Sequence, residues 1–412
     1  MTVELSPLKP EHQEPTMMLS TPTSSIAEDL IARIGKCADE IEAGAEQNEH
    51  AGRLTKDTMD ALQASGVLDA MVPAECGGAD LTLYDVLRVY EALSYVDTSA
   101  AWVAMIPGVQ GKALLLLDES ARSKLTAPGY PFVAGQGAPT GIATPASGGY
   151  HVSGRWSYGS ALLHCDTATG MATVVDNDHP VLDEAGDPVA IIFFTPVTNV
   201  KVEGNWDTLG MRATGSVDYS MSNVFVPFEH TAQKPFTTPL GGQGHAKLVG
   251  FTAWTMSVHC AVPLGTGRRL LDEIAAFARQ PRRRGLRLAD DPRFTHDYGK
   301  AEAAYRSARA FMYEAFGAAQ QRVNLGDAVT RRDLTDMRAA SVLLHDVNVG
   351  NATFAVRESG GLGLRAGRLQ RLYRDIVAMG QHIQVSQPTW GECAKDYLGE
   401  AEGLQWALNQ LV

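Results

Sequence analysis

The hydrophobic pattern of this chain changes its period twice, and this change limits the folds that the chain can adopt. Apolar residues recur at helical spacing between residues 25 and 125, and helical spacing returns between 237 and 412. Between 126 and 236, short apolar runs are separated by turn signals at intervals of about ten residues, which is typical of strands. The predicted strands are 150–154, 169–175, 189–195 and 218–226. With no helical pattern between them, these strands predict an antiparallel sheet or barrel.

The same pattern predicts the domain organisation. Residues 1–24 are rich in Pro, Thr, Ser and Glu, so we predict a mobile tail. The segment Ser25–Glu28 matches a capping box and opens an N-terminal helical domain over 25–125, which is followed by a central β domain over 126–236. The long helical patterns of 237–412 predict an antiparallel four-helix bundle. Its predicted helices are 246–279, 297–324, 331–358 and 384–412.

Charge and cysteine usage exclude several classes of protein. The formal net charge of −12 argues against a nucleic-acid-binding protein, because phosphate binding requires a basic surface. The longest apolar runs are shorter than a bilayer span and the N-terminus has no signal-peptide pattern, so we expect a cytoplasmic protein without membrane contact. The five cysteines are scattered and no pair has metal-ligand spacing, so we expect free thiols and no metal site.

One stretch near the C-terminus carries a candidate functional group. An apolar segment after Arg374 and Asp375 ends at Gly380, and a lone histidine, His382, follows it. A helix that ends at Gly380 leaves His382 on a loop, where reacting groups are often held. A lone histidine is more often a surface or core residue, so His382 needs support from the rest of the chain.

Several short motifs occur in an order that resembles the acyl-CoA dehydrogenase superfamily. Residues 205–216 read NWDTLGMRATGS and 223–227 read NVFVP, which is similar to the family's run in its β domain. Val72–Gly78 resembles the family's N-terminal turn, and Arg374 and Asp375 fall where the family has its late Arg-Asp pair. The resemblance implies a mostly helical α+β fold with an N-terminal helical domain, a central antiparallel β domain and a C-terminal four-helix bundle.

The residues favour one branch of that superfamily over its dehydrogenases. A dehydrogenase needs a glutamate as its base, and the two positions where the family carries it correspond to 381–383 and 254–256, which hold no carboxylate. Instead, Gly154–Ser160 reads GRWSYGS and Arg371–Asp375 is followed by His382, which resembles the flavin-dependent two-component monooxygenases. One departure is Ala161, where many relatives have glycine.

This resemblance implies the oxygenase component of a two-component monooxygenase. A separate flavin reductase is expected to supply reduced FMN or FAD, which with O2 forms a C4a-hydroperoxyflavin that oxygenates a small organic substrate. By resemblance, Ser160 is expected at flavin N5, His382 at the peroxide, and Tyr158 over one face of the flavin. The expected cofactor-binding residues are Tyr158, Ser160, Trp206, Arg212, Thr214, Ser216 and Arg284, with Arg282 and Arg283 as open alternatives to Arg284. Gln136 and His164 are expected to face the substrate, and a homotetramer assembled through the C-terminal bundles is also implied.

Other interpretations of these residues stay open. Ser160 can cap a turn, and Thr214 and Ser216 can close one. His259 and His345 lie in apolar helical patterns, which predicts core histidines.

Two alternative functions also stay open. One is a flavin dehydrogenase or oxidase of the acyl-CoA dehydrogenase type, whose base comes from an unexpected position. The other is a redox-silent member of the superfamily that uses the pocket for binding or for non-oxidative chemistry. Fold analogy does not identify the substrate, because substrate choice depends on dispersed side chains.

Overall fold

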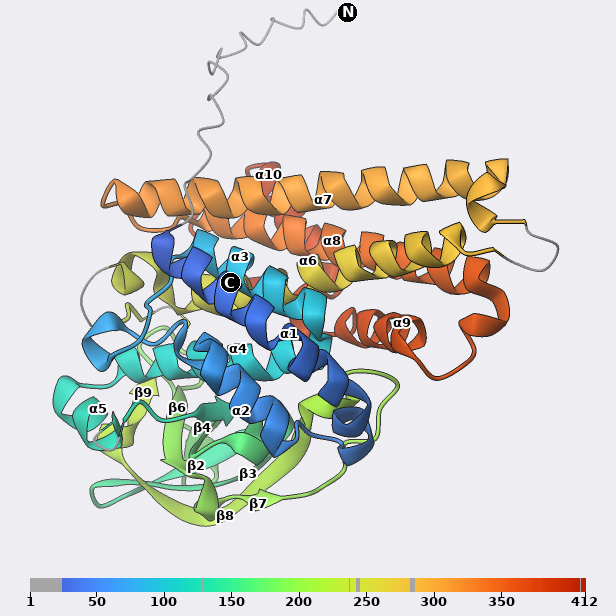
Figure 1. The fold of residues 1–412 in the computed structure, drawn as a ribbon. Helices are drawn as coiled ribbons and strands as arrows, with labels where there is room; N and C mark the ends of the chain where they lie inside the picture. Colours follow the sequence, from blue (N-terminus) through green and yellow to red (C-terminus); the bar gives the residue numbers. More distant parts are fainter. Residues whose placement is uncertain (1–23, 127–128, 237, 242–244, 282–285, 408) are drawn as a thin grey trace, which may run out of the picture.

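The computed structural model describes residues 24–126, 129–236, 238–241, 245–281, 286–407 and 409–412. Three layers are visible in Figure 1: the long C-terminal helices lie along one side, the N-terminal helices lie in the middle, and the sheet lies on the opposite side. This arrangement confirms the predicted mostly helical α+β fold. Nearly all of the predicted tail (1–23) and Arg284 lie outside the described residues.

The N-terminal helices begin and end at residues that suit those positions. They are α1 (Ser25–Ala51), α2 (Lys56–Ser65), α3 (Leu83–Val96), α4 (Thr98–Lys112) and α5 (Glu119–Thr126). The cap of α1 is Ser24, whose hydroxyl accepts a hydrogen bond from the Ala27 amide at 3.2 Å, so the predicted cap at Ser25 is wrong by one residue. Helix α2 ends before Gly66, because this glycine takes a φ of 76° that other residues avoid.

Helix α4 lies in the centre of the molecule, between the sheet and the other helices (Figure 1). Its N-terminus is capped by Asp97, whose carboxylate accepts a hydrogen bond from the Ala100 amide at 2.8 Å. Nearly all of its residues are buried, because α4 packs against α3, α6 (Ala246–Arg279), β1 (Val133–Gly135) and the short 3-10 helix η6 (Arg212–Thr214). The helix therefore carries Trp102 to the boundary between the helical layers and the sheet.

The strands form a mixed sheet in the order β7-β8-β3-β2-β4-β6-β9, with β1 and β5 paired to β4. They are β1 (Val133–Gly135), β2 (Gly141–Ala146), β3 (Gly149–Gly159), β4 (Thr167–Asp176), β5 (His179–Pro180), β6 (Ala190–Pro196), β7 (Lys201–Val202), β8 (Val217–Pro227) and β9 (Thr231–Gln233). The expectation of a purely antiparallel sheet is corrected, because β1 and β2 each run parallel to β4. After β3 the chain crosses through η4 (Leu162–His164) to the other edge of β2, which places β4 parallel to β2.

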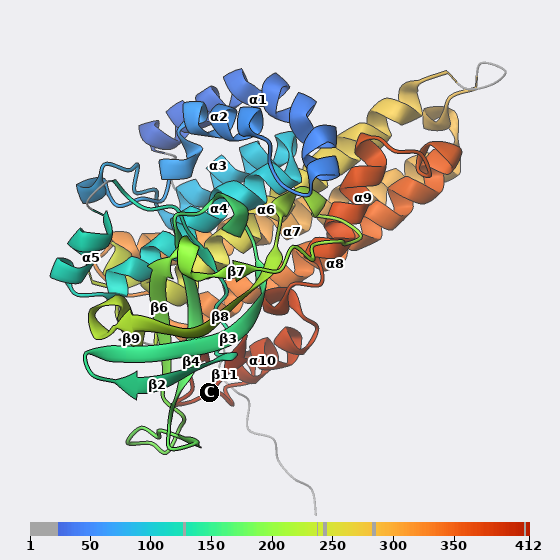
Figure 2. The same ribbon diagram turned by 90° about the horizontal axis from the view of Figure 1, so that it is seen from below.

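The C-terminal bundle is formed by α6 (Ala246–Arg279), α7 (Pro292–Asn324), α8 (Arg331–Ser359) and α9 (Arg368–Met379). In Figure 2 one end of this bundle projects beyond the sheet. The predicted helix 384–412 is wrong, since the segment contains η11 (Ile383–Val385), α10 (Pro388–Tyr397) and a hairpin of β10 (Trp406–Ala407) and β11 (Gln410–Leu411). Packing decides this: Trp406 is 2% exposed and donates a hydrogen bond to the Thr335 hydroxyl on α8 at 2.9 Å.

Two segments, Thr98–Leu116 and Ala246–Arg279, are long and apolar enough to cross a membrane, which corrects the expectation that no apolar run reaches that length. The most apolar part of Thr98–Leu116 is 89% buried inside the fold, and that of Ala246–Arg279 is 83% buried. Such burial is typical of core helices, and both segments line the centre of the molecule in Figure 1.

Candidate functional site

The end of strand β3 turns Ser160 into the interior of the molecule. Its pairing with β8 is interrupted between Trp156 and Gly159 by a bulge, within which Tyr158 has a φ of 62°. Tyr158 is 67% exposed, whereas Ser160 is 8% exposed. The bulge therefore leaves an aromatic ring on the surface beside a buried hydroxyl group.

Three buried hydroxyl groups form a continuous hydrogen-bonded row, which we call the hydroxyl row (Ser160, Ser216 and Thr214). The Ser160 and Ser216 oxygens are 2.7 Å apart, and the Ser216 and Thr214 oxygens are also 2.7 Å apart. At one end, the Trp102 indole N–H donates to Ser160 at 3.1 Å. At the other end, the Thr214 hydroxyl donates to the Met211 carbonyl at 2.7 Å. The row connects helix α4 to the 211–216 turn through the end of β3.

Trp102 also connects Ser160 to His382. Helix α9 ends before Gly380, as predicted, and His382 follows on the loop that leads into η11. The Trp102 ring lies edge-on to the rings of His382 and His259, with centroid distances of 5.7 and 5.1 Å. The rings of His382 and His259 are 4.3 Å apart. The two residues predicted to be catalytic therefore both contact one indole.

Hydrogen bonds assign the neutral tautomer of each imidazole in this cluster. Nδ1 of His382 accepts the Gln384 amide at 3.3 Å, so the proton of the neutral ring is on Nε2. Nδ1 of His259 is 2.7 Å from the Thr255 carbonyl, and Nδ1 of His345 is 2.9 Å from the Ser341 carbonyl, so each of these rings carries its proton on Nδ1.

Burial keeps the imidazoles neutral. It lowers the pKa of His382 well below its ordinary value, and the neighbouring His259 and His345 lower that pKa further. Burial also lowers the pKa of His259, to about 4. At neutral pH, His382 is therefore a neutral ring that offers an Nε2–H group.

The two motifs that carry the family resemblance meet beside the hydroxyl row. The Met211 amide donates a hydrogen bond to the Asp375 carboxylate at 2.6 Å, and the Arg374 guanidinium donates to the Leu209 carbonyl at 3.1 Å. A side chain at Gly210 would lie 2.1 Å from the Arg374 carbonyl oxygen, so only glycine fits this contact. Asp375 is 3% exposed. The turn that holds one end of the row is thus docked on helix α9.

The remaining predicted site residues lie in different surroundings. The Trp206 indole N–H donates to the Met211 carbonyl at 3.1 Å, and its ring lies edge-on to that of Tyr158 at 6.1 Å. The Arg212 guanidinium donates to the Thr208 carbonyl at 3.1 Å and lies 3.3 Å from Asp207.

Gln136 and His164, the two residues predicted to bind substrate, differ in the hydrogen bonds that their side chains make. The Gln136 side chain accepts a hydrogen bond from the Ala138 amide at 2.9 Å. The His164 Nε2 atom is buried without a hydrogen-bond partner among the described residues, and burial lowers the pKa of this ring.

Sequence reasoning missed the roles of Trp102 and Asp375 in the site and treated His259 as a core residue. Trp102 and His259 sit inside apolar helices with no local polar pattern, and Asp375 was read only as half of a motif.

The residues fit a flavin. An exposed aromatic ring at Tyr158 beside a buried polar row suits a planar ring system whose edge carries hydrogen-bonding atoms. Ser160 accepts a hydrogen bond from Trp102 and shares another with the Ser216 hydroxyl, which leaves it able to make one further hydrogen bond. Among the described residues, no group of three or more His, Cys, Asp or Glu side chains is arranged to hold a metal ion.

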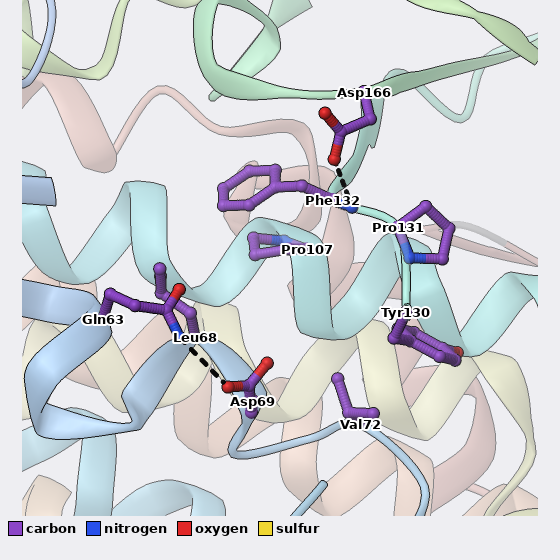
Figure 3. Close-up of a pocket in the computed structure, with 9 residues that line it drawn as sticks. All are labelled: Gln63, Leu68, Asp69, Val72, Pro107, Tyr130, Pro131, Phe132 and Asp166. Carbon is purple, nitrogen blue, oxygen red and sulfur yellow. Dashed lines mark hydrogen bonds between the residues drawn. The ribbon is translucent and has the colours of Figure 1, made fainter. Parts of the chain in front are cut away.

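Two of the cavities among the described residues share no lining residue with this cluster. Figure 3 shows one of about 190 Å³ between η1 (Val67–Asp69), α4 and the segment before β1. Both carboxylates that line it are engaged, since Asp69 accepts from the Gln63 amide group at 3.3 Å and Asp166 accepts from the Phe132 amide at 3.3 Å. The other, of about 420 Å³, lies by the start of α6 and Trp406. Neither cavity is lined by Ser160 or His382.

Comparison with known proteins identifies the family. The model of the acyl-CoA dehydrogenase N-terminal domain matches residues 31–118, and the model of the C-terminal domain matches 257–387. Indole-3-acetate monooxygenase of Pseudomonas putida is 30% identical over 84% of this chain and 88% of its own length. The oxygenase component of the FADH(2)-dependent resorcinol hydroxylase of Rhizobium sp. is 23% identical over 87% of this chain and 90% of its own length.

The solved structure of XiaF from Streptomyces sp., in complex with FADH2 and glycerol, has the same fold. It superposes with a TM-score of 0.82 at 22% identity, over 91% of this chain and 96% of that one. The chain therefore belongs to the acyl-CoA dehydrogenase family, within its branch of flavin-dependent monooxygenases.

Proposed function

We propose that this protein is the oxygenase component of a two-component flavin-dependent monooxygenase. It takes reduced flavin from a separate reductase and uses O2 to oxygenate a small organic molecule. The observation that supports this most is the position of Trp102, whose indole donates to Ser160 and packs edge-on against His382. In the sequence, Ser160 lies 58 positions and His382 lies 280 positions from Trp102, and the fold holds both against this one side chain. A site for a single reaction requires its groups to be held together in this way.

Reduced flavin, when bound, supplies the two electrons with which O2 is split into an oxygen atom for the substrate and one for water. Ser160 holds the flavin edge by a hydrogen bond at N5, and the exposed Tyr158 ring covers part of a flavin face. His382 directs its Nε2–H group into the reaction space and donates a hydrogen bond there as a neutral imidazole. Trp102 and His259 pack around His382, fix its orientation and exclude water.

The proposed cofactor is reduced FAD, with reduced FMN as the alternative to be tested beside it. The resorcinol hydroxylase relative is named as FADH(2)-dependent and XiaF was solved with FADH2, and both support FAD. The name of the resorcinol hydroxylase relative, an oxygenase component, supports a separate reductase as partner. Trp206, Arg212, Gln136 and His164 stay proposed contacts to flavin or substrate.

The proposed substrate class is a small aromatic molecule, and indole-3-acetate is the first compound to test. The relative with 30% identity is named for that compound, and the aromatic edges of Trp102, His259 and His382 suit an aromatic ring. We further propose a cytoplasmic homotetramer assembled through the C-terminal bundles. The burial of the two long apolar helices inside the fold supports a location away from membranes.

The test is rapid mixing of the protein, loaded anaerobically with reduced FAD or FMN, with oxygenated buffer. We expect a spectrum distinct from that of oxidised flavin that persists for seconds, and hydroxylated product when indole-3-acetate is present. His382→Ala should divert most of the O2 consumed into hydrogen peroxide. The matched control is His179→Ala, at an exposed position on the β5 hairpin, and this variant should not increase the share of O2 that becomes hydrogen peroxide. A protein that binds no reduced flavin would contradict the proposed function.

A further inference from the structure

We propose that Asp375 is a positioning residue for Ser160: by holding the Met211 turn, it fixes the hydroxyl row in one direction, so that Ser160 meets a bound flavin only as a hydrogen-bond acceptor. This inference rests on the proposed function, and it adds a reason why the site should distinguish reduced from oxidised flavin. It is carried by five consecutive hydrogen bonds that run from α9 to α4.

The direction of the row follows from counting protons. A carbonyl oxygen only accepts, so the single hydroxyl proton of Thr214 is used on the Met211 carbonyl. In the next contact Ser216 must then be the donor, and its only proton is used on Thr214. In the contact after that, Ser160 must be the donor to Ser216. The proton of Ser160 is therefore already engaged within the protein.

The other end of the row leads to the same conclusion. Trp102 Nε1–H is only a donor, so Ser160 accepts its hydrogen bond at 3.1 Å. Ser160 then has one free lone pair and no free proton. Any further partner of this oxygen has to be a donor.

This asymmetry matches one redox state of a flavin. Atom N5 carries a hydrogen in reduced flavin and can donate it to the free lone pair of Ser160. In oxidised flavin N5 carries only a lone pair, which would face the lone pair of Ser160. Two acceptors placed against each other without a proton leave both unsatisfied in a buried site, which is unfavourable. The row should therefore favour reduced flavin.

Asp375 keeps the end of this row in place. Met211 has a φ of 55°, a conformation that a side chain as large as methionine rarely adopts. Its amide is held by the buried Asp375 carboxylate at 2.6 Å, and the close approach of Gly210 to helix α9 brings the turn within reach of this carboxylate. Without the acceptor at Asp375, the turn is free to rotate the Met211 carbonyl away from Thr214. The protons of the row are then no longer confined to one direction.

The experiment compares the affinities of oxidised and reduced flavin, measured by anaerobic titration of the flavin absorbance. The ratio of the two dissociation constants is determined for the wild type and for two pairs of variants. Asp375→Leu removes the acceptor for Met211, whereas Asp375→Asn keeps one. Thr214→Val removes a hydroxyl from the row, whereas Thr214→Ser keeps it. We expect the Leu and Val variants to lower the preference for reduced flavin about tenfold, and the Asn and Ser variants to retain most of it.

A double variant provides the decisive comparison. If Asp375 acts through Ser160, then Asp375→Leu combined with Ser160→Ala should lower the ratio no further than Ser160→Ala alone. Additive effects, or an Asp375→Leu protein with the wild-type ratio, would overturn the inference. If Asp375→Leu does not fold, the Thr214→Val and Thr214→Ser pair decides the question. A wild type that binds no flavin contradicts the proposed function itself, whereas one that binds both redox states equally contradicts only this inference.

Discussion

Replacing Asp375 with asparagine should make the protein more stable at alkaline pH. Burial raises the pKa of the Asp375 carboxyl to about 7, and the nearby Asp97 and Glu49 raise it, while the Met211 amide and Arg374 lower it. In the unfolded chain the same group has its ordinary pKa of 3.8. The difference corresponds to up to about 4 kcal/mol of unfolding free energy.

The sign follows from proton binding. Below pH about 4 the carboxyl is protonated in both states and costs nothing. Between pH about 4 and about 7 the folded state holds a proton that the unfolded state has lost, so the folded protein becomes less stable as the pH rises. Above pH about 7 the full cost is present. Asparagine is neutral at every pH and still offers an oxygen to the Met211 amide, so the variant avoids this cost.

The assay is urea unfolding of the flavin-free protein at pH about 5 and about 8, followed by circular dichroism. Asp375→Asn should unfold at higher urea than the wild type at pH about 8, by an amount that corresponds to about 2–4 kcal/mol, and the gain should shrink by more than half at pH about 5. The matched control is Asp29→Asn, whose carboxylate is 66% exposed and pairs with Arg33 on one helix, so its effect should be small at both pH values. An Asp375→Asn protein that gains nothing at pH about 8, or gains equally at both pH values, would refute the buried-charge argument.

Three further outcomes follow from the site. Gly210→Ala should destabilise the protein by about 2–4 kcal/mol in thermal unfolding, because its methyl group would lie 2.1 Å from the Arg374 carbonyl; a stable Ala variant would show that α9 and the turn are not tightly docked. Trp102→Phe keeps an aromatic ring but removes the hydrogen bond to Ser160, and should weaken binding of reduced flavin about tenfold by fluorescence titration, whereas unchanged affinity would argue against that bond. The ring nitrogens of His382 should show the neutral Nε2–H form by NMR between pH about 6 and about 9, because the pKa of this residue is held well below its ordinary value; a titration in that range would contradict the assignment.

The buried charge of Asp375 lowers the free energy of unfolding, which a residue with a purely structural role could avoid. A neutral side chain of similar shape would hold the Met211 amide without taking a carboxylate out of water. A residue that lowers stability and nevertheless holds the end of the row that leads to the proposed flavin contact is typical of positions selected for function. The charge makes the hydrogen bond to Met211 stronger than an amide would, which favours a fixed turn over maximum stability.

Local patterns in the sequence were sufficient to predict most of the long helices, the strands β3, β4, β6 and β8, and the end points of several helices. Helical and strand periods separated the helical segments from the sheet, and Gly380 marked the end of helix α9. The absence of a glutamate at 254–256 and 381–383 was also visible, and it favoured a monooxygenase over a dehydrogenase. Ser160 and His382 were found through motifs, whose spacing is local.

Tertiary structure alone decided how those parts meet. Trp102 and Ser160 are 58 residues apart, and Met211 and Asp375 are 164 residues apart, so no periodicity links them. The final segment illustrates the same limit: its helical spacing predicted a helix to 412, but packing of Trp406 on α8 favours a hairpin. The sequence by itself determined most of the long helices and the strands β3, β4, β6 and β8, because their periodic patterns depend on neighbours along the chain. The direction of the hydroxyl row, the tautomer of His382 and the burial of Asp375 depend on neighbours in space, which only folding brings together.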